Sequence, residues 1–235
     1  MIKGNKVVLC ALVLSSCTKP IPELEAPVLP DQFPVDRYTM SSSAPVFKVD
    51  PQRSEVLVTV RRGGLMAKLG HDHIVSSGQL QGFILMDRDN QRCHAEFYFP
   101  LHSMEVDNPQ LRAQAGMQTT PSDKDINGTR INMLRSLEAK QFPFVQLRSD
   151  NCSEAFSNSS VLVDIQLHGE TQQQQIELQW HRDGTGILTA HSTFSILQTD
   201  FNIAPFSVMN GLIKVEDRLE VDVRLVANPL NTTKQ

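Results

Sequence analysis

Five stretches of the chain place an apolar side chain at every second position. These apolar positions are Val56, Val58 and Val60; Ala95, Phe97, Phe99 and Leu101; Val161, Val163, Ile165 and Leu167; Ile176, Leu178 and Trp180; and Leu219, Val221, Val223 and Leu225. Successive side chains of a strand point to opposite faces, so this period indicates strands with one dry and one wet face. The pattern predicts an all-β, antiparallel protein, either a barrel or a sandwich.

One stretch between the predicted strands has a helical spacing instead. Its apolar residues are Ile126, Ile131, Leu134 and Leu137. Ser122 is a suitable N-cap, and Asp125 follows three residues later in place of the usual Glu. Pro143 stops any helix that reaches it, because proline has no N–H to donate. We therefore expect one or two short helices inserted between the strands.

The first 17 residues resemble a bacterial lipoprotein signal. Lys3 and Lys6 precede an apolar run over residues 7–14, which ends in Leu-Ser-Ser before Cys17. The run is far shorter than the roughly 20 residues that span a bilayer. The resemblance implies cleavage before Cys17 and lipid on its sulfur and on the new amino group, which is enough to hold a protein on a membrane. An ordinary secretory signal with a chance cysteine is the alternative.

The lipoprotein interpretation places the protein on the periplasmic side of the bacterial cell envelope. Thr18, not Asp, follows the lipidated cysteine, which by bacterial sorting rules favours the outer membrane. Residues 18–45 are rich in proline and are expected to form a semi-rigid tether. Residues 46–228 then form one domain, and residues 229–235 form a tail.

The net charge bears on the partners of the protein, and its cysteines bear on disulfide bonding. The net charge is −4, and loss of Lys3 and Lys6 with the signal makes it −6, so nucleic acid is not an expected partner. Cleavage also removes Cys10, which leaves Cys93 and Cys152 beside the lipidated cysteine. In an oxidising compartment these two are expected to form a disulfide, although two separate buried thiols are the alternative.

Four segments, in order, resemble the YceI-like family of periplasmic lipid-binding proteins. They are "FKVDPQRSEVLVTVRRGGL", "INMLRSLEAKQFPFVQLRS", "VDIQLHGETQQQQIELQW" and "FSILQTDFNI". The likeness runs from about residue 46 to 228. It implies an extended eight-stranded antiparallel barrel, similar to lipocalins, that holds a long isoprenoid such as a quinone tail in an apolar tunnel. It implies neither a shared enzymatic reaction nor a cofactor other than the bound lipid.

The inward apolar residues are the candidate ligand-binding set. They are Phe97, Phe99, Val163, Ile165, Leu178, Trp180 and Phe194. An eight-stranded barrel can leave an interior large enough for one ligand. The same alternating residues would also fill a solid core, which would make the protein an interaction scaffold that binds no ligand.

The segment "KLGHDHIV" departs from the family, which usually carries a basic residue and then aromatics after the equivalent of Gly70. In an extended segment His71 and His73 point the same way and could share a zinc, copper, iron or nickel ion. Zinc needs a third ligand. The candidates are His168, His102, His191 and Asp72, and the set we weigh is His71, His73 and His168.

Two other roles remain open for His71, Asp72 and His73. A histidine beside an aspartate can act as an oriented base, but no Gly-x-Ser-x-Gly element supplies a nucleophile, so we expect no enzyme. Alternatively, His71, Asp72 and His73 form a polar rim that holds a lipid head group. We expect them at a strand end near the barrel mouth, because burying an unpaired polar group costs about 1–3 kcal/mol. The leading hypothesis is a lipid-anchored carrier or sequestering protein; a histidine metal site with redox or hydrolytic use is the second.

Overall fold

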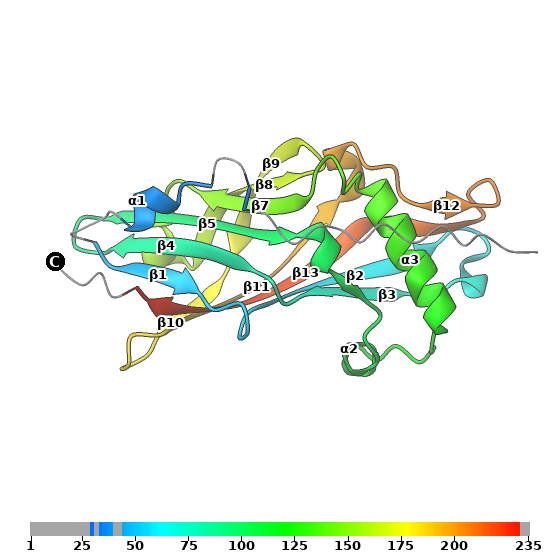
Figure 1. Cartoon of the computed structure of the whole chain (residues 1–235), viewed down its shortest axis with the longest axis horizontal. Coiled ribbons are helices and arrows are strands. Elements are labelled where there is room, and N and C mark those ends of the chain that lie inside the picture. Colours follow the sequence, from blue (N-terminus) through cyan, green and yellow to red (C-terminus); the bar gives the residue numbers. More distant parts are fainter. Residues whose placement is uncertain (1–28, 31–32, 40–43, 231–235) are drawn as a thin grey trace, which may run out of the picture.

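The computed structural model describes residues 29–30, 33–39 and 44–230, and strands dominate this part of the chain (Figure 1). The strands are β1 (Val46–Val49), β2 (Glu55–Gly63), β3 (His73–Ser77), β4 (Gln81–Asp87), β5 (Arg92–Pro100), β6 (Glu105–Val106), β7 (Phe144–Ser149), β8 (Ser160–Leu167), β9 (Glu170–Glu177), β10 (Gln179–Arg182), β11 (Leu188–Leu197), β12 (Ser207–Val208) and β13 (Ile213–Pro229). The helices are α1 (Val35–Thr39), α2 (Pro109–Gln114), α3 (Asp123–Ser136) and α4 (Ala155–Asn158), with 3₁₀ turns η1 (Ala67–Leu69), η2 (Leu101–Ser103) and η3 (Gln198–Phe201). Within the described ranges, no helix has the length and apolar character needed to span a membrane. The predicted signal peptide with Cys17, and most of the predicted tether, lie outside these residues.

All the strands belong to one antiparallel sheet, ordered β6-β3-β2-β13-β1-β4-β5-β7-β8-β9, with β10 paired to β11 and both β11 and β12 paired to β13. The expected antiparallel all-β fold with a few short helices is confirmed. Within the described residues the sheet has thirteen strands and not eight, because long strands are interrupted. β1 and β2 both pair with the long strand β13, β4 pairs with β1, and β3 pairs with β2. β10 follows β9 after a break at Leu178. A closed barrel was expected, but the sheet is open, because no hydrogen-bonded ladder joins β9 to β11 in the described part of the chain.

The residues with a period of two face the interior. Four of the five predicted stretches lie in β2, β5, β8 and β13, apart from Leu101 in η2, and the fifth spans the junction of β9 and β10. Most of their apolar positions pack into one core that includes Val56, Phe99, Ile165 and Val221. β4 does not alternate between buried and exposed side chains, because six of its seven residues are buried. Both of its faces are covered: the inner one by the core and the outer one by the chain segment around α1.

The segment around α1 packs against the domain and does not form part of the expected semi-rigid tether. Tyr38 is fully buried and its ring stacks on Phe83 of β4, with centroids 5.2 Å apart. Its hydroxyl donates to Glu96 Oε2 at 2.8 Å, and Arg37 pairs with Glu96 Oε1 at 3.3 Å. Burial, and then the Glu96 carboxylate, raise the pKa of Tyr38. The described residues on either side of α1 therefore belong to the folded body.

The inserted helix α3 begins as predicted. The Ser122 side chain accepts from the Asp125 N–H while the Asp125 carboxylate accepts from the Ser122 N–H, which completes a capping box. The helix ends at Ser136, seven residues before Pro143. It lies obliquely across the sheet near the end that carries β12 (Figure 1).

The two cysteines that the sequence singled out are joined. A disulfide links Cys93 of β5 to Cys152, which precedes α4, with a Cα–Cα distance of 4.8 Å. The Cys152 N–H also donates to the Cys93 carbonyl at 3.1 Å. The bridge ties the turn before α4 to the edge of the core.

Candidate functional site

A cavity of about 360 Å³ lies inside the curved sheet. Its volume falls within the range of roughly 300–1,000 Å³ that is usual for small-molecule sites. All seven residues of the candidate ligand-binding set line it: Phe97, Phe99, Val163, Ile165, Leu178, Trp180 and Phe194. They come from β5, β8, β11 and the β9–β10 junction. The interior is therefore hollow, and the alternative of a solid core does not describe this fold.

The cavity wall is apolar over almost all of its extent. Aliphatic and aromatic side chains of strands form the sides, and Met133 of α3 and Leu137, which caps the C-terminus of this helix, close one part. Trp180 presents its ring to the cavity while its indole N–H donates to the Ala155 carbonyl at 2.9 Å, so its polar atom is satisfied elsewhere. Such a wall binds hydrocarbon by removing it from water and offers little to a charged ligand.

Polar side chains are a minority of the cavity lining. They include His73 of β3, and Thr129, Asn132 and Ser136 on the face of α3 that also carries Met133. The others are Arg148, Ser149, His191, Ser192 and Gln198. A mostly apolar pocket with a few polar groups is the usual form of a site that orients a ligand by one end.

His71 and His73 lie together where β3 begins. Their ring centroids are 4.7 Å apart, and both rings are partly buried. His73 lines the cavity, whereas His71 does not. The side chains share one side of the chain because residues two apart in an extended segment point the same way.

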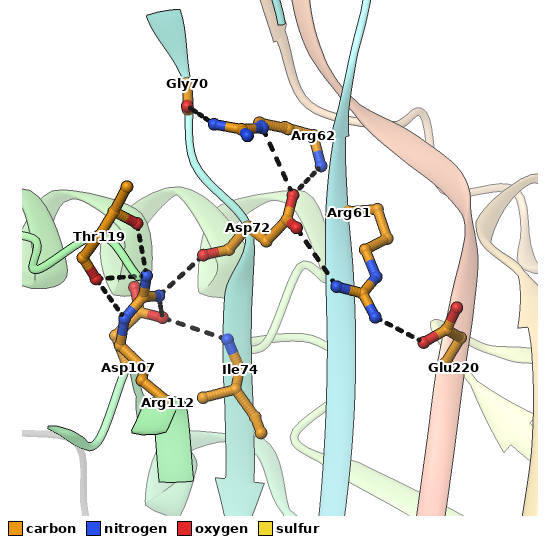
Figure 2. Close-up of polar contacts among 9 residues, drawn as sticks. All are labelled: Arg61, Arg62, Gly70, Asp72, Ile74, Asp107, Arg112, Thr119 and Glu220. Carbon is orange, nitrogen blue, oxygen red and sulfur yellow. Dashed lines mark hydrogen bonds and ion pairs between the residues drawn. The ribbon is translucent and has the colours of Figure 1, made fainter. Parts of the chain in front are cut away.

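The Asp72 carboxylate points toward Arg61 and Arg62 (Figure 2). Its carboxylate accepts from the Arg62 N–H at 3.0 Å and from the Arg61 guanidinium at 3.2 Å. Burial acts to raise the pKa of Asp72, but the bonds from Arg62 and Arg61 outweigh it and hold the pKa below its usual value. Asp72 therefore joins an arginine network on the sheet and does not orient either imidazole.

The acid that does contact His73 is Asp107, which the sequence reasoning missed. Asp107 is almost completely buried, and its Oδ2 accepts from His73 Nδ1 at 2.6 Å. Its Oδ1 accepts from the Ile74 N–H at 3.1 Å and from Arg112 at 2.5 Å (Figure 2). Burial acts to raise the pKa of Asp107, but His73, Ile74 and Arg112 together lower it.

Arg112 completes this buried cluster. Besides Asp107 it donates to the Asp72 carbonyl at 2.7 Å and to the Thr119 carbonyl and hydroxyl, both at 2.8 Å (Figure 2). Asn108 caps the N-terminus of α2, and Arg112 is the buried residue of this helix. The pair Asn108-Pro109 is an N-cap signal followed by a first-turn proline, and it could have identified α2, although not the partner of Arg112.

His71 has an unsatisfied polar atom. Its Nε2 is buried and has no hydrogen-bond partner within the described part of the chain, and burial followed by the charge of His73 lowers the pKa of His71. Among the described residues, His71, His73 and Asp107 each offer one possible metal-ligand atom within 4.8 Å of the others. The third member of the metal alternative is thus Asp107.

His168, which we had weighed as the third ligand, lies elsewhere. Its Nδ1 contacts the Phe201 carbonyl at 3.0 Å, and its ring packs edge-on against Phe142. His191 pairs with Asp222 at 2.8 Å. Neither these two nor His102 belongs to the described group of possible metal ligands.

Comparison with solved structures finds the same fold at low sequence identity. BcnA from Burkholderia cenocepacia matches with a TM-score of 0.52 and 13% identity, over 77% of this chain and 99% of that one. A polyisoprenoid binding domain from Saccharophagus degradans, implicated in plant cell wall breakdown, matches with a TM-score of 0.55 and 13% identity, over 78% and 98%.

A search of curated proteins found no match. The model of the YceI-like domain matches residues 47–227, which is most of the chain. This match agrees in extent with the sheet, its cavity and the histidine cluster described above. The chain therefore belongs to the YceI-like domain family.

Proposed function

We propose that this protein is a lipid-anchored periplasmic binding protein that carries or sequesters a long-chain isoprenoid or a similar amphiphilic lipid. The observation that carries the proposal is the hollow, almost wholly apolar interior. Each methylene that leaves water for such a wall contributes about 0.8 kcal/mol, so a long tail binds without charge pairing. The solved S. degradans relative that is described as polyisoprenoid binding supports the same ligand class.

The histidine cluster supplies a polar end for the ligand. Asp107 holds Nδ1 of His73, which leaves Nε2 of that ring for a lipid head group. The neighbouring His71 Nε2 has no hydrogen-bond partner among the described residues, and a ligand hydroxyl or carbonyl held beside His73 would satisfy it. Replacing His71 and His73 together by Ala should preserve the fold and weaken binding of the same lipid. Unchanged binding would leave the two histidines as a structural turn.

The test of the proposal is mass spectrometry of an organic extract from natively purified protein. Wild type should carry stoichiometric lipid. Ala190→Trp fills the cavity, which Ala190 lines, and should reduce the lipid content. Leu162→Trp is the matched control, because Leu162 is 45% exposed on the sheet exterior, and it should retain the lipid. A folded wild type with no lipid would contradict the proposal.

A metal site is the second candidate, and the convergence of His71, His73 and Asp107 favours it. Two imidazoles and a carboxylate suit zinc or iron. Elemental analysis of the same natively purified sample tests it. Stoichiometric metal that disappears in the double histidine variant would support this candidate, and a metal-free sample that still holds lipid would oppose it.

A further inference from the structure

Two turns lie side by side at the end of the sheet that carries β12 (Figure 1). One comprises residues 63–70 and the other residues 206–214, and we name them together the apolar lip. The Met66 N–H donates to the Leu212 carbonyl at 2.9 Å, and Gly63 pairs in register with Lys214. A Cβ at Gly64 would lie 2.4 Å from the Leu212 carbonyl oxygen, so only glycine permits this close contact.

The apolar lip concentrates the exposed apolar side chains of the described chain. Five of the nine large apolar side chains that are exposed belong to it, and their exposed fractions are Leu65 92%, Leu69 66%, Met209 57%, Val208 40% and Phe206 37%. Scattered exposed apolar residues are ordinary, but a cluster of them marks an interaction site. The second turn is built to project, because Met209, Asn210 and Gly211 all have positive φ.

The charge of the apolar lip is opposite to that of the whole protein. Neither turn contains an Asp or a Glu, and each contains one exposed lysine, Lys68 and Lys214. The whole chain has a net charge of −4. Apolar side chains beside exposed lysines match a surface that combines hydrocarbon with anionic head groups.

The apolar lip is continuous with the cavity. Phe206 is both partly exposed and part of the cavity wall. Its carbonyl accepts from the N–H of Val215, which also lines the cavity, as does Val60 of the strand that leads into the first turn. Phe206 therefore joins the exposed apolar surface of the lip to the apolar wall of the cavity.

We propose that the apolar lip docks on a phospholipid surface with anionic head groups and that the lipid ligand enters and leaves the cavity there. This inference rests on the proposed function, since it describes how the ligand of that cavity is loaded. Each methylene that must cross water slows the transfer of a lipid about fourfold, so a long isoprenoid needs direct contact between the membrane and the cavity mouth.

The test uses flotation on vesicles. The chain from residue 18 onward retains every described element and lacks the predicted anchor, so any flotation reports on the folded body. It should float with vesicles of phosphatidylethanolamine and phosphatidylglycerol and less well with phosphatidylcholine alone. The lip variant Leu65→Ser/Leu69→Ser/Met209→Ser should lower partitioning at least tenfold. The control Leu29→Ser/Leu162→Ser/Leu197→Ser removes three leucines that are 38–45% exposed outside the lip and should change it less than twofold.

A second readout is uptake of an isoprenoid quinone from donor vesicles. The lip variant should take it up at least tenfold more slowly and reach the same final occupancy, because no cavity group is altered. Lys68→Gln/Lys214→Gln should remove the preference for phosphatidylglycerol. Matched urea midpoints, read by fluorescence of the single tryptophan, would show that these surface substitutions leave the fold intact.

The outcomes separate this inference from the proposed function. Bound lipid in the native extract, with flotation and uptake unchanged in the lip variant, would overturn the inference alone. Absence of lipid from the extract would overturn the proposed function even if flotation depended on the lip. A concentration-dependent dimer of the wild type that the lip variant abolishes, without vesicle binding, would assign the lip to a second copy of the chain and also overturn the inference.

Discussion

Arg112→Met should destabilise the protein strongly although Arg112 lies outside the main apolar core. Arg112 and Asp107 are both buried, and Arg112 N–H groups also satisfy the carbonyls of Asp72 and Thr119. Methionine keeps the length of the side chain and removes its charge and donors. Asp107 is then left with only the Ile74 N–H and His73 as partners. Breaking a buried ion pair by removing one partner costs about 3–5 kcal/mol, and we expect a loss in this range.

A double-mutant cycle with Asp107→Asn separates the charge effect from lost packing. Asn is the suitable replacement, because Asp107 has a φ of +57° and Asn tolerates the left-handed region. Asn also still accepts the Ile74 N–H. The double variant should be less destabilised than the sum of the single variants, by about 2 kcal/mol or more, since it leaves no buried unpaired charge.

The assay is urea unfolding without reductant, followed by the fluorescence of Trp180. Trp180 is the only tryptophan and lines the cavity, so its signal reports on the core. Unfolding free energies are compared at the common denaturant slope. A cost below about 1 kcal/mol for Arg112→Met, or strict additivity in the double variant, would refute the view that this cluster is a tightly coupled buried pair.

Three further outcomes are expected. The pKa of Tyr38 is raised on folding, so its stability contribution is complete below about pH 10 and falls as pH rises above that value, by up to about 1.4 kcal/mol per pH unit. In urea titrations at alkaline pH, Tyr38→Phe should remove the part of the pH dependence of the unfolding free energy that Tyr38 causes. The part caused by Tyr98, whose pKa burial also raises, should remain. Replacing Cys93 and Cys152 by Ala should lower the unfolding free energy by about 4 kcal/mol for a loop of 59 residues, and wild type unfolded without reductant should show neither thiol free. Cys17→Ser should abolish labelling with fatty acid; a variant that still labels and stays on the membrane would contradict the lipoprotein interpretation.

The sequence determined the features that depend on local periodicity. Alternation of apolar residues identified the interior side of five strands, since a strand's side chains must alternate between faces. Six of the seven residues named for the cavity lie in these stretches, and all seven line it. The capping box at Ser122 and Asp125 was also readable, because its two partners lie three residues apart.

Only the tertiary structure decided which distant residues meet. β6 has two residues and no recognisable pattern, yet its pairing of Val106 with Val75 brings Asp107 to His73 across 34 positions of sequence. The same kind of long-range packing sends His168 to Phe142 and fastens Tyr38 over β4. Such contacts depend on strand register and on which faces are covered, and these are properties of the assembled sheet that no local segment encodes.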